Sequence, residues 1–212
     1  MSRVITIGRE FGSGGHEVGL KLSEKLGIPF YDKLLVSMVA EEGDFAPEYL
    51  HEMEEKVELH IAPFLATRSS YSVYQQPMSD KIFFRQADII RRLAAEGPCV
   101  IVGRCSDYVL EHEKVDALHV FLHAKIEDRI ARKLRMDTGI AVDNMERHIK
   151  ATDRRRAKYY RHYTGRVWGA RENYHLCLNT SYVGIDGAVD TIITYLNDMK
   201  PASRDEIANP QR

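Results

Sequence analysis

The stretch from residue 3 to residue 32 constrains the fold more than any other, because it joins a short apolar run, a glycine-rich loop and an amphipathic segment. The run at 4–7, Val-Ile-Thr-Ile, is too short for a helix and is followed by a glycine, which predicts a buried strand. Glycines recur through 8–15, and the segment 18–27 then places apolar residues on one helical face. The order strand, glycine loop, helix is therefore expected at the N-terminus.

The glycine loop is a candidate phosphate cradle. Gly12, Gly14 and Gly15 let backbone N–H groups approach an anion closely, and the following helix adds unpaired N–H groups and the positive end of its dipole. The loop departs from the Walker pattern G-x-x-x-x-G-K-[ST], because Gly15 and His16 stand where the lysine and the hydroxyl residue belong. A tight strand-to-helix turn without a ligand is the alternative interpretation of the loop alone.

A second apolar run at 28–31, Ile-Pro-Phe-Tyr, ends at Asp32. The carboxyl ends of strands in an open parallel sheet face the ligand crevice, so Asp32 is expected on the same edge as the glycine loop. There it could hold a magnesium-bound water or a substrate hydroxyl. Asp32 could equally be the N-cap of a helix over 33–41, and the two roles are compatible.

Three further apolar runs predict strands, with helical periodicity between them. They lie at 98–103, 117–122 and 174–179, and an amphipathic helix over 185–196 closes the pattern. Arg104 follows the first of these runs, where a cation could neutralise a second phosphate. Strands separated by helical segments indicate βαβ units and a parallel sheet.

Composition and cysteine use narrow the class of protein. A chain of 212 residues can form one domain with its own core and a mobile lid. Its net charge of −1 provides no overall electrostatic attraction to nucleic acid or to a membrane. Cys99, Cys105 and Cys177 lack C-x-x-C spacing, which favours buried thiols in a reducing compartment. No apolar run approaches about 20 residues and no signal peptide precedes the first strand, so a cytoplasmic protein is expected.

The charge is unevenly distributed along the chain. The stretch 125–171 holds fourteen Lys and Arg against six Asp and Glu, a balance of +8 within a chain of −1. Arg129, Arg132 and Arg135 recur along one helical face, and Asp143 with Glu146 forms a capping-box start for a second basic helix. Two arginine-rich helices are typical of a lid that closes over phosphates.

Two other interpretations of the basic stretch remain open. It could be a solvated basic face, or an RNA-binding surface in which Tyr159, Tyr160 and Tyr163 stack on bases. The balanced net charge of the whole chain argues against nucleic acid as the partner. A small phosphate-bearing molecule is therefore the favoured partner.

The order and spacing of these segments resemble the cytidylate kinase branch of the nucleoside monophosphate kinases. More narrowly, the chain is similar to the cytidylate kinase-like proteins, whose loop reads REYGSGG where this chain has REFGSGG. The other stretches that carry the resemblance are FYD at 30–32, VIVGR at 100–104, VFL-x-A-x3-DR-x2-R at 120–132, D-x-x-R at 153–156 and YHLCLNTS at 174–181.

The resemblance implies an α/β fold, a P-loop NTPase-type three-layer sandwich with a five-stranded parallel sheet. It implies a single domain with a helical NMP-binding insertion and a basic lid. The segments are a core at 1–32, 97–134 and 164–200, the insertion at 33–96, the lid at about 135–163 and a polar tail at 201–212.

The resemblance also implies roles for individual residues. ATP would be the donor, its phosphates held by the loop residues Gly12, Ser13, Gly14 and Gly15 with His16 beside them. Asp32 would lie by the acceptor and Mg²⁺, and Arg104 would bind the acceptor's phosphate. Arg132 and Arg156 would meet the transferring phosphoryl group, and Asp153 would orient the lid.

The chain departs from the family pattern at three positions. Gly15 replaces the Walker lysine, Cys105 replaces the aspartate that helps cytidylate kinases read cytosine, and Ile149 replaces the first lid arginine. Loss of one charged donor costs on the order of 3–4 kcal/mol in the transition state unless another group replaces it. Arg9, His16 or Lys21 could supply that charge.

Two functional hypotheses follow. The first is an ATP- and Mg²⁺-dependent kinase that phosphorylates a nucleoside monophosphate, CMP or one like it, or a similar small phosphate acceptor. The second is a nucleotide sensor that binds without turnover, which the missing lysine favours. Neither the acceptor nor the oligomeric state follows from the sequence.

Overall fold

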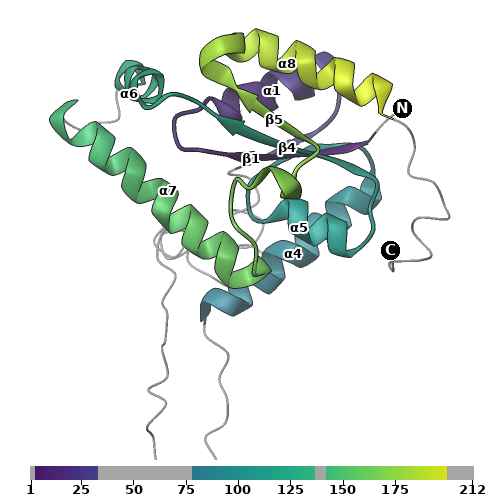
Figure 1. The fold of residues 1–212 in the computed structure, drawn as a ribbon. Coiled ribbons are helices and arrows are strands. Elements are labelled where there is room, and N and C mark those ends of the chain that lie inside the picture. The colour runs from purple at the N-terminus through teal and green to yellow at the C-terminus, as the bar shows by residue number, and fades with distance from the viewer. Residues whose placement is uncertain (1–2, 33–77, 137–141, 200–212) are drawn as a thin grey trace, which may run out of the picture.

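The computed structural model describes residues 3–32, 78–136 and 142–199, and these form a parallel sheet between two layers of helices (Figure 1). The sheet has five strands in the order β2-β3-β1-β4-β5. The strands are β1 (Val4–Arg9), β2 (Phe30–Tyr31), β3 (Val100–Val102), β4 (Ala117–His123) and β5 (Leu176–Asn179). The helices are α1 (Gly15–Leu26), α4 (Met78–Glu96), α5 (Ser106–His112), α6 (Ile126–Arg135), α7 (Val142–Thr164) and α8 (Thr180–Asp198), with a 3₁₀ turn at Arg171–Asn173.

The predicted α/β class and the five parallel strands are confirmed. Strand β1 lies at the centre, with Ile7 beside Val102 of β3 on one side and Val120 of β4 on the other. All three side chains are fully buried, because helices cover both faces of a parallel sheet and each face must be apolar. The carboxyl ends of the strands therefore share one edge.

Each face of the sheet packs on its own pair of helices. On one face, Leu22 of α1 and Ile192 of α8 pack with Ile5 of β1. On the other face, Ile90 of α4 and Leu110 of α5 pack with Ile101 of β3. Figure 1 shows α6 and α7 together at the end of the sheet where the loop after β1 lies. This edge is the one that the sequence predicted for a ligand.

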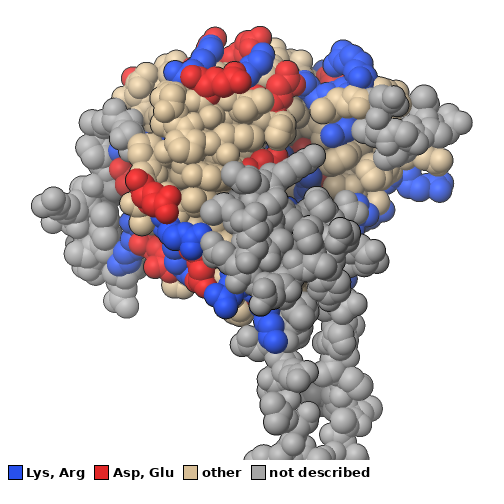
Figure 2. All heavy atoms as spheres, turned by 180° about the vertical axis from the view of Figure 1, so that it is seen from behind, with Lys and Arg blue, Asp and Glu red and all other residues tan. Residues whose placement is uncertain are grey.

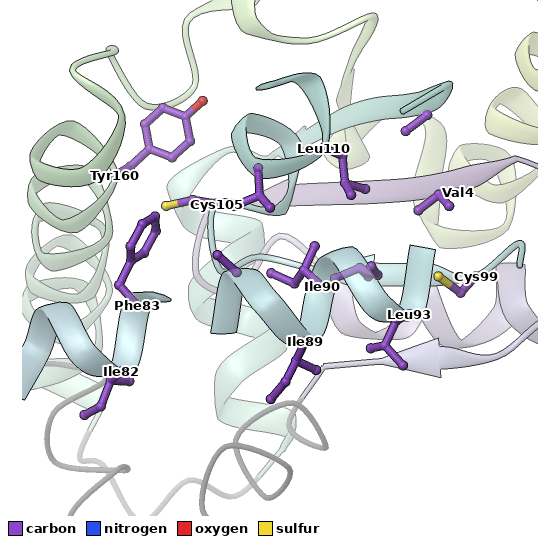
Figure 3. Packing of buried hydrophobic residues seen from close by; sticks show 14 residues of the cluster. Val4, Ile82, Phe83, Ile89, Ile90, Leu93, Cys99, Cys105, Leu110 and Tyr160 are labelled. Atoms are coloured by element: carbon purple, nitrogen blue, oxygen red, sulfur yellow. The ribbon is translucent and has the colours of Figure 1, made fainter. Parts of the chain in front are cut away.

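The tyrosines of the basic stretch face the interior. Tyr160 is 4% exposed and belongs to the core beside α4, and Figure 3 shows Tyr160, Cys105 and Phe83 directed toward one another. Tyr163 stacks on Phe83 with ring centroids 4.0 Å apart, and Tyr159 packs against the same core. These tyrosines therefore pack against the core, and the interpretation in which they stack on RNA bases stays a hypothesis.

Charges of both signs alternate on the surface formed by α1 and α8 (Figure 2). Lys21 and Lys25 of α1 lie 2.7 Å from Asp186 and Asp190 of α8. The hydrogen bond to Asp186 raises the pKa of Lys21. Lys21 therefore serves the α1–α8 surface, and the alternative that it supplies the missing charge at the loop is not supported by its position.

Several element boundaries differ from the sequence prediction. Helix α7 begins at Val142, so Asp143 lies inside the helix and is not its N-cap. Helix α8 begins at Thr180 with Asn179 as its N-cap, and it is kinked at Gly184, whose φ is 67°. Strands β2, β3 and β5 are shorter than the apolar runs that predicted them, because a strand extends only as far as its hydrogen bonds to the neighbouring strand.

The three cysteines are free. Cys99 and Cys105 are buried, but Cys177 is exposed, contrary to the expectation of buried thiols, because β5 lies at an edge of the sheet. Within the described part of the chain, every helix is too short or too polar to span a bilayer. Of the insertion predicted at 33–96, residues 33–77, with the helix that Asp32 would cap, lie outside the described residues, as does the tail at 201–212, and residues 78–96 form α4.

Candidate functional site

The glycine loop connects β1 to α1 and is held in shape by its own backbone. Gly12 and Gly14 have φ values of 85° and 89°, which side chains rarely adopt. A Cβ on Gly14 would lie 2.3 Å from Cδ1 of Ile185 and 3.3 Å from Cζ of Arg132. Both positions therefore require glycine, and the first turn of α1 with its N–H groups lies directly after the loop.

Two hydroxyl groups fix the base of the loop. The buried Ser13 hydroxyl donates a hydrogen bond to the carbonyl of Glu10 at 2.9 Å. The buried Thr180 hydroxyl, at the start of α8, donates to the carbonyl of Ser13 at 2.8 Å. In this structure Ser13 thus supports the loop through its side chain and also through its backbone N–H, which donates to the carbonyl of Glu10 at 3.3 Å.

Arginines from three elements line one cavity of about 170 Å³ at the carboxyl edge of the sheet. Arg9 ends β1, Arg104 follows β3, and Arg155 and Arg156 come from α7. Asp107 is the one acid among the described residues that line the cavity, and burial raises its pKa, which favours its neutral form. The arrangement gives the cavity a strong excess of positive charge.

The electrostatics of Arg156 point to an anion. Burial and the neighbouring guanidiniums of Arg9 and Arg104 together lower its pKa to about 9, while Asp153 opposes the shift. Its Nη1 donates to the carbonyl of Arg9 at 3.1 Å, so the charged end of Arg156 lies where the side chain of Arg9 leaves the backbone. Like charges held together in a cleft are stabilised by a bound anion between them.

Part of the lining of this cavity, the aromatic wall, consists of aromatic side chains. They are Tyr159, Tyr160, Trp168 and Tyr174. The hydroxyl of Tyr160 donates to Asp107 at 2.7 Å, so the wall also carries a fixed polar group. A cavity lined by both guanidiniums and flat aromatic rings suits a planar ring that bears a phosphate.

The turn after β3 positions Arg104 in this cavity. Gly103, Arg104 and Cys105 have φ values of 80°, 60° and 54°, a left-handed run that is rare for residues with side chains. Such backbone persists only where the surrounding structure determines it, and it is frequent at ligand sites. Cys105 is 4% exposed and its thiol faces the core, so burial raises its pKa well above the ordinary value.

Helix α7 is tied to the loop by an ion-pair network. Asp153 accepts a hydrogen bond from the N–H of Phe11 at 2.8 Å and pairs with Arg129 of α6. Arg129 is 6% exposed, and it also contacts Glu10 at 3.0 Å and the carbonyl of Phe11 at 2.8 Å. Of the three arginines predicted on one face of α6, Arg129 is thus buried, and it joins α6 to the glycine loop and to α7.

Asp32 lies at the end of β2, 8% exposed, beside the loop. One oxygen of its carboxylate lies 3.3 Å from Nη2 of Arg9, and the other lies 2.6 Å from Nδ1 of His16. His16 thus points toward Asp32 from the first turn of α1. No group of three or more acidic, histidine or cysteine side chains suited to a metal occurs among the described residues.

A second cavity, of about 200 Å³, lies on the side of the loop where α6 and α8 meet. Its lining includes Gly12, Arg132, Arg135, Thr180 and Ser181. Arg132 contacts Glu17 of α1 at 2.9 Å, and its guanidinium also lies beside Gly14. Arg132 and Arg156, both predicted at the transferring phosphoryl group, therefore line different cavities.

The structure thus brings most predicted residues to one edge. Arg9, Arg104 and Arg156 share the first cavity, Arg9 also reaches Asp32, and Arg132 lies on the loop. Sequence reasoning missed Arg155, Asp107, Trp168 and Tyr174, and it missed Thr180 and Ser181 at the second cavity. Thr180 and Ser181 follow a predicted strand directly, so the rule that ligands bind at the carboxyl ends of parallel strands could have found them.

Comparison with known proteins finds the same family that the sequence motifs resemble. A model of the cytidylate kinase-like family matches residues 4–182. The search of curated proteins found no match. Among solved structures, an uncharacterized protein from Eubacterium ventriosum is 27% identical, with a TM-score of 0.70 over 93% of this chain and 99% of that chain.

Two shikimate kinases have a similar fold. The enzyme from Bacteroides thetaiotaomicron is 17% identical, with a TM-score of 0.56 over 93% of this chain and 99% of that chain. The enzyme from Acinetobacter baumannii, solved in complex with shikimate, is also 17% identical, with a TM-score of 0.53 over 94% and 96%. At this identity the likeness shows the fold alone, which is that of the P-loop kinases, as predicted.

Proposed function

Since the chain belongs to the cytidylate kinase-like family, we propose that it transfers the γ-phosphoryl group of ATP to the phosphate of a nucleoside monophosphate, CMP or one like it, or of a similar small acceptor. One observation carries the proposal: the guanidiniums of Arg9, Arg104 and Arg156 share a cavity beside a glycine loop. Phosphoryl transfer needs little covalent chemistry from the protein, and it depends on positioning and on positive charge.

The proposed step balances without an added proton carrier. An oxygen of the acceptor's phosphate forms a bond to the γ-phosphorus, and the bond from that phosphorus to the β,γ-bridging oxygen breaks. The electron pair leaves with ADP, and the acceptor gains the phosphoryl group. A phosphate monoester is mostly a dianion at neutral pH, since its second pKa is about 6, so its attacking oxygen carries no proton.

The first cavity, which holds Arg9, Arg104 and Arg156, is the proposed acceptor site. Arg104 and Arg156 would hold the acceptor's phosphate by charge-assisted hydrogen bonds, and the aromatic wall would hold its ring. The polar group formed by Asp107 and Tyr160 would contact the ring's hydrogen-bonding edge. Cys105 also lines this cavity but has a thiol where cytidylate kinases have a carboxylate, so base selection would depend on Asp107 and Tyr160.

The loop and the second cavity form the proposed donor site. Gly12, Ser13, Gly14 and Gly15 would hold the phosphates of ATP through backbone N–H groups, with His16 beside them. Arg132, beside Gly14, would contact these phosphates, and the rest of ATP would occupy the second cavity. Asp153 would keep α7, the proposed lid, in register with the loop.

Mg²⁺ would be held at Asp32 together with phosphates and water. Magnesium in kinases needs only one or two carboxylates, because substrate phosphates and water fill the remaining positions. Asp32, buried beside the loop, fits this limited demand, because a carboxylate has lone pairs for the ion as well as for Arg9. The metal would neutralise charge on the transferring group.

The test is turnover with defined acceptors. The full chain is incubated with millimolar ATP and Mg²⁺ and with CMP, dCMP, UMP, AMP or GMP, and ADP and the diphosphate product are measured together. We expect one acceptor to give both products in equal amounts, and Arg156→Ala to reduce the rate at least 100-fold while Arg171→Ala, an exposed control, does not. Absence of both products with every acceptor contradicts the proposal.

A second candidate function is a sensor that binds ATP and closes without turnover. The observation in its favour is Gly15 at the position of the Walker lysine. Titration calorimetry distinguishes the two functions, because the sensor binds ATP with micromolar or better affinity and yields neither ADP nor phosphorylated acceptor. Product formation at catalytic rates excludes it.

A further inference from the structure

The volume in which a side chain of residue 15 would lie is filled by Arg9. A Cβ built on Gly15 would lie 2.6 Å from Cγ and 2.7 Å from Cβ of Arg9, closer than real Cβ contacts. Gly15 is the first residue of α1 and stands where the Walker pattern has its lysine. Arg9 therefore occupies the volume that a lysine at residue 15 would need, which links the absence of the lysine to the position of Arg9.

The guanidinium of Arg9 extends from the loop to the acceptor cavity. A Cβ on Gly103, in the turn that carries Arg104, would lie 1.7 Å from Nη1 of Arg9. Gly15 and Gly103 thus flank the same side chain, one at its stem and one at its charged end. Arg9 therefore spans the space between the proposed donor loop and the proposed acceptor site.

Neighbouring groups hold this conformation. Asp32 lies 3.3 Å from Nη2 of Arg9, and the carbonyl of Arg9 accepts a hydrogen bond from Arg156. The side chain of Arg9 is 20% exposed, so its charge is partly shielded from water but open to a ligand in the cavity. A guanidinium held in place in this way can stabilise charge without reorganising.

We propose that Arg9 takes the place of the Walker lysine, and that its guanidinium, arriving from the end of β1 rather than from α1, contacts the γ-phosphate of ATP as it moves to the acceptor. This inference rests on the proposed function for the transfer itself. The contact with the γ-phosphate requires only that ATP binds.

Reciprocal substitution tests the shared volume. Arg9→Ala should lower kcat about 100- to 1,000-fold. Arg9→Lys should retain more activity, because it keeps the charge. Gly15→Lys alone should also lower kcat and the melting temperature, because Arg9 occupies the space, and Gly15→Ala should show the same effect more weakly.

The double variant Arg9→Ala, Gly15→Lys tests whether a lysine at residue 15 can replace the guanidinium of Arg9. It removes the obstructing stem and restores a cation from α1, so we expect kcat at least tenfold above that of Arg9→Ala. Arg171→Ala, prepared in parallel, controls for loss of a surface arginine. A folded double variant no faster than Arg9→Ala, or an Arg9→Ala variant within threefold of the original chain, overturns the inference.

Calorimetry separates this inference from the proposed function. The ratio of ATP to ADP affinity measures contact with the γ-phosphate, and it needs no turnover. If the chain binds ATP but phosphorylates no acceptor, the kinase proposal fails, yet a fall of at least tenfold in this ratio for Arg9→Ala still supports the inference. An unchanged ratio overturns the inference, and a chain that binds no ATP overturns both.

Discussion

Replacement of Asp153 by alanine should release α7 from the glycine loop. In the structure, Asp153 accepts a hydrogen bond from the N–H of Phe11 and pairs with Arg129, whose side chain is 7% exposed. Each bond to a charged group contributes about 1.5–3 kcal/mol. Glu10 remains beside Arg129 and offsets part of the loss. We therefore expect Asp153→Ala to lower the free energy of unfolding by about 3–5 kcal/mol, the range for breaking a buried ion pair.

Urea unfolding followed by circular dichroism measures this change. Asp153→Asn keeps an oxygen that can accept from Phe11 but loses the charge, so it should cost about half as much. Arg154→Ala, at the exposed neighbouring position of α7, is the control and should change stability by no more than about 0.5 kcal/mol. The melting temperature of Asp153→Ala should fall by about 10 °C. A loss below about 1 kcal/mol for Asp153→Ala would refute the view that this carboxylate ties α7 to the loop.

Three further predictions concern other parts of the molecule. Gly14→Ala should destabilise the protein more than Gly27→Ala. Both glycines have a positive φ, but only at Gly14 would the new Cβ meet another atom, Cδ1 of Ile185, at 2.3 Å. Gly27→Ala should cost about 1 kcal/mol in thermal unfolding, and an equal loss for the two variants would contradict the packing around Gly14. Tyr160→Phe removes the side-chain donor to the buried Asp107 and should cost about 1–3 kcal/mol in urea unfolding, whereas Tyr182→Phe, at a residue 74% exposed, should have no effect. Burial lowers the pKa of His119 to about 4 from its ordinary 6.5, so the unfolded chain binds more protons between these values. The free energy of unfolding should therefore fall by about 3 kcal/mol as the pH is lowered from 6.5 to 4, and His119→Gln should flatten that slope in urea titrations at stepped pH.

Much of the fold could be predicted from local patterns. The apolar runs at 4–7, 98–103 and 117–122 are short and bounded by glycines or polar residues, and each overlaps a strand of the sheet. Their spacing by helical segments is sufficient to specify parallel pairing, since parallel strands need crossover connections. Because the carboxyl ends of parallel strands share one edge, the sequence also predicts the glycine loop, Asp32 and Arg104 on that edge.

The direction in which side chains point could not be predicted in this way. Arg129 and Arg132 share a helical face in the sequence, but Arg129 is buried among acids and Arg132 lies beside Gly14. Tyr160 lies in a basic stretch and is nonetheless a core residue. Periodicity identifies which residues share a face, but the elements that pack against that face decide which are buried.

The sequence by itself determined the order of strands and helices, the positions that need glycine and the excess of positive charge between 125 and 171, because these depend on neighbours in the chain. Tertiary structure alone decided which cation lies at the position of the absent lysine. Three candidates were equivalent in the sequence, and only Arg9 fills the space above Gly15 and reaches Gly103. That choice depends on distances between residues that are remote along the chain, and no local pattern encodes them.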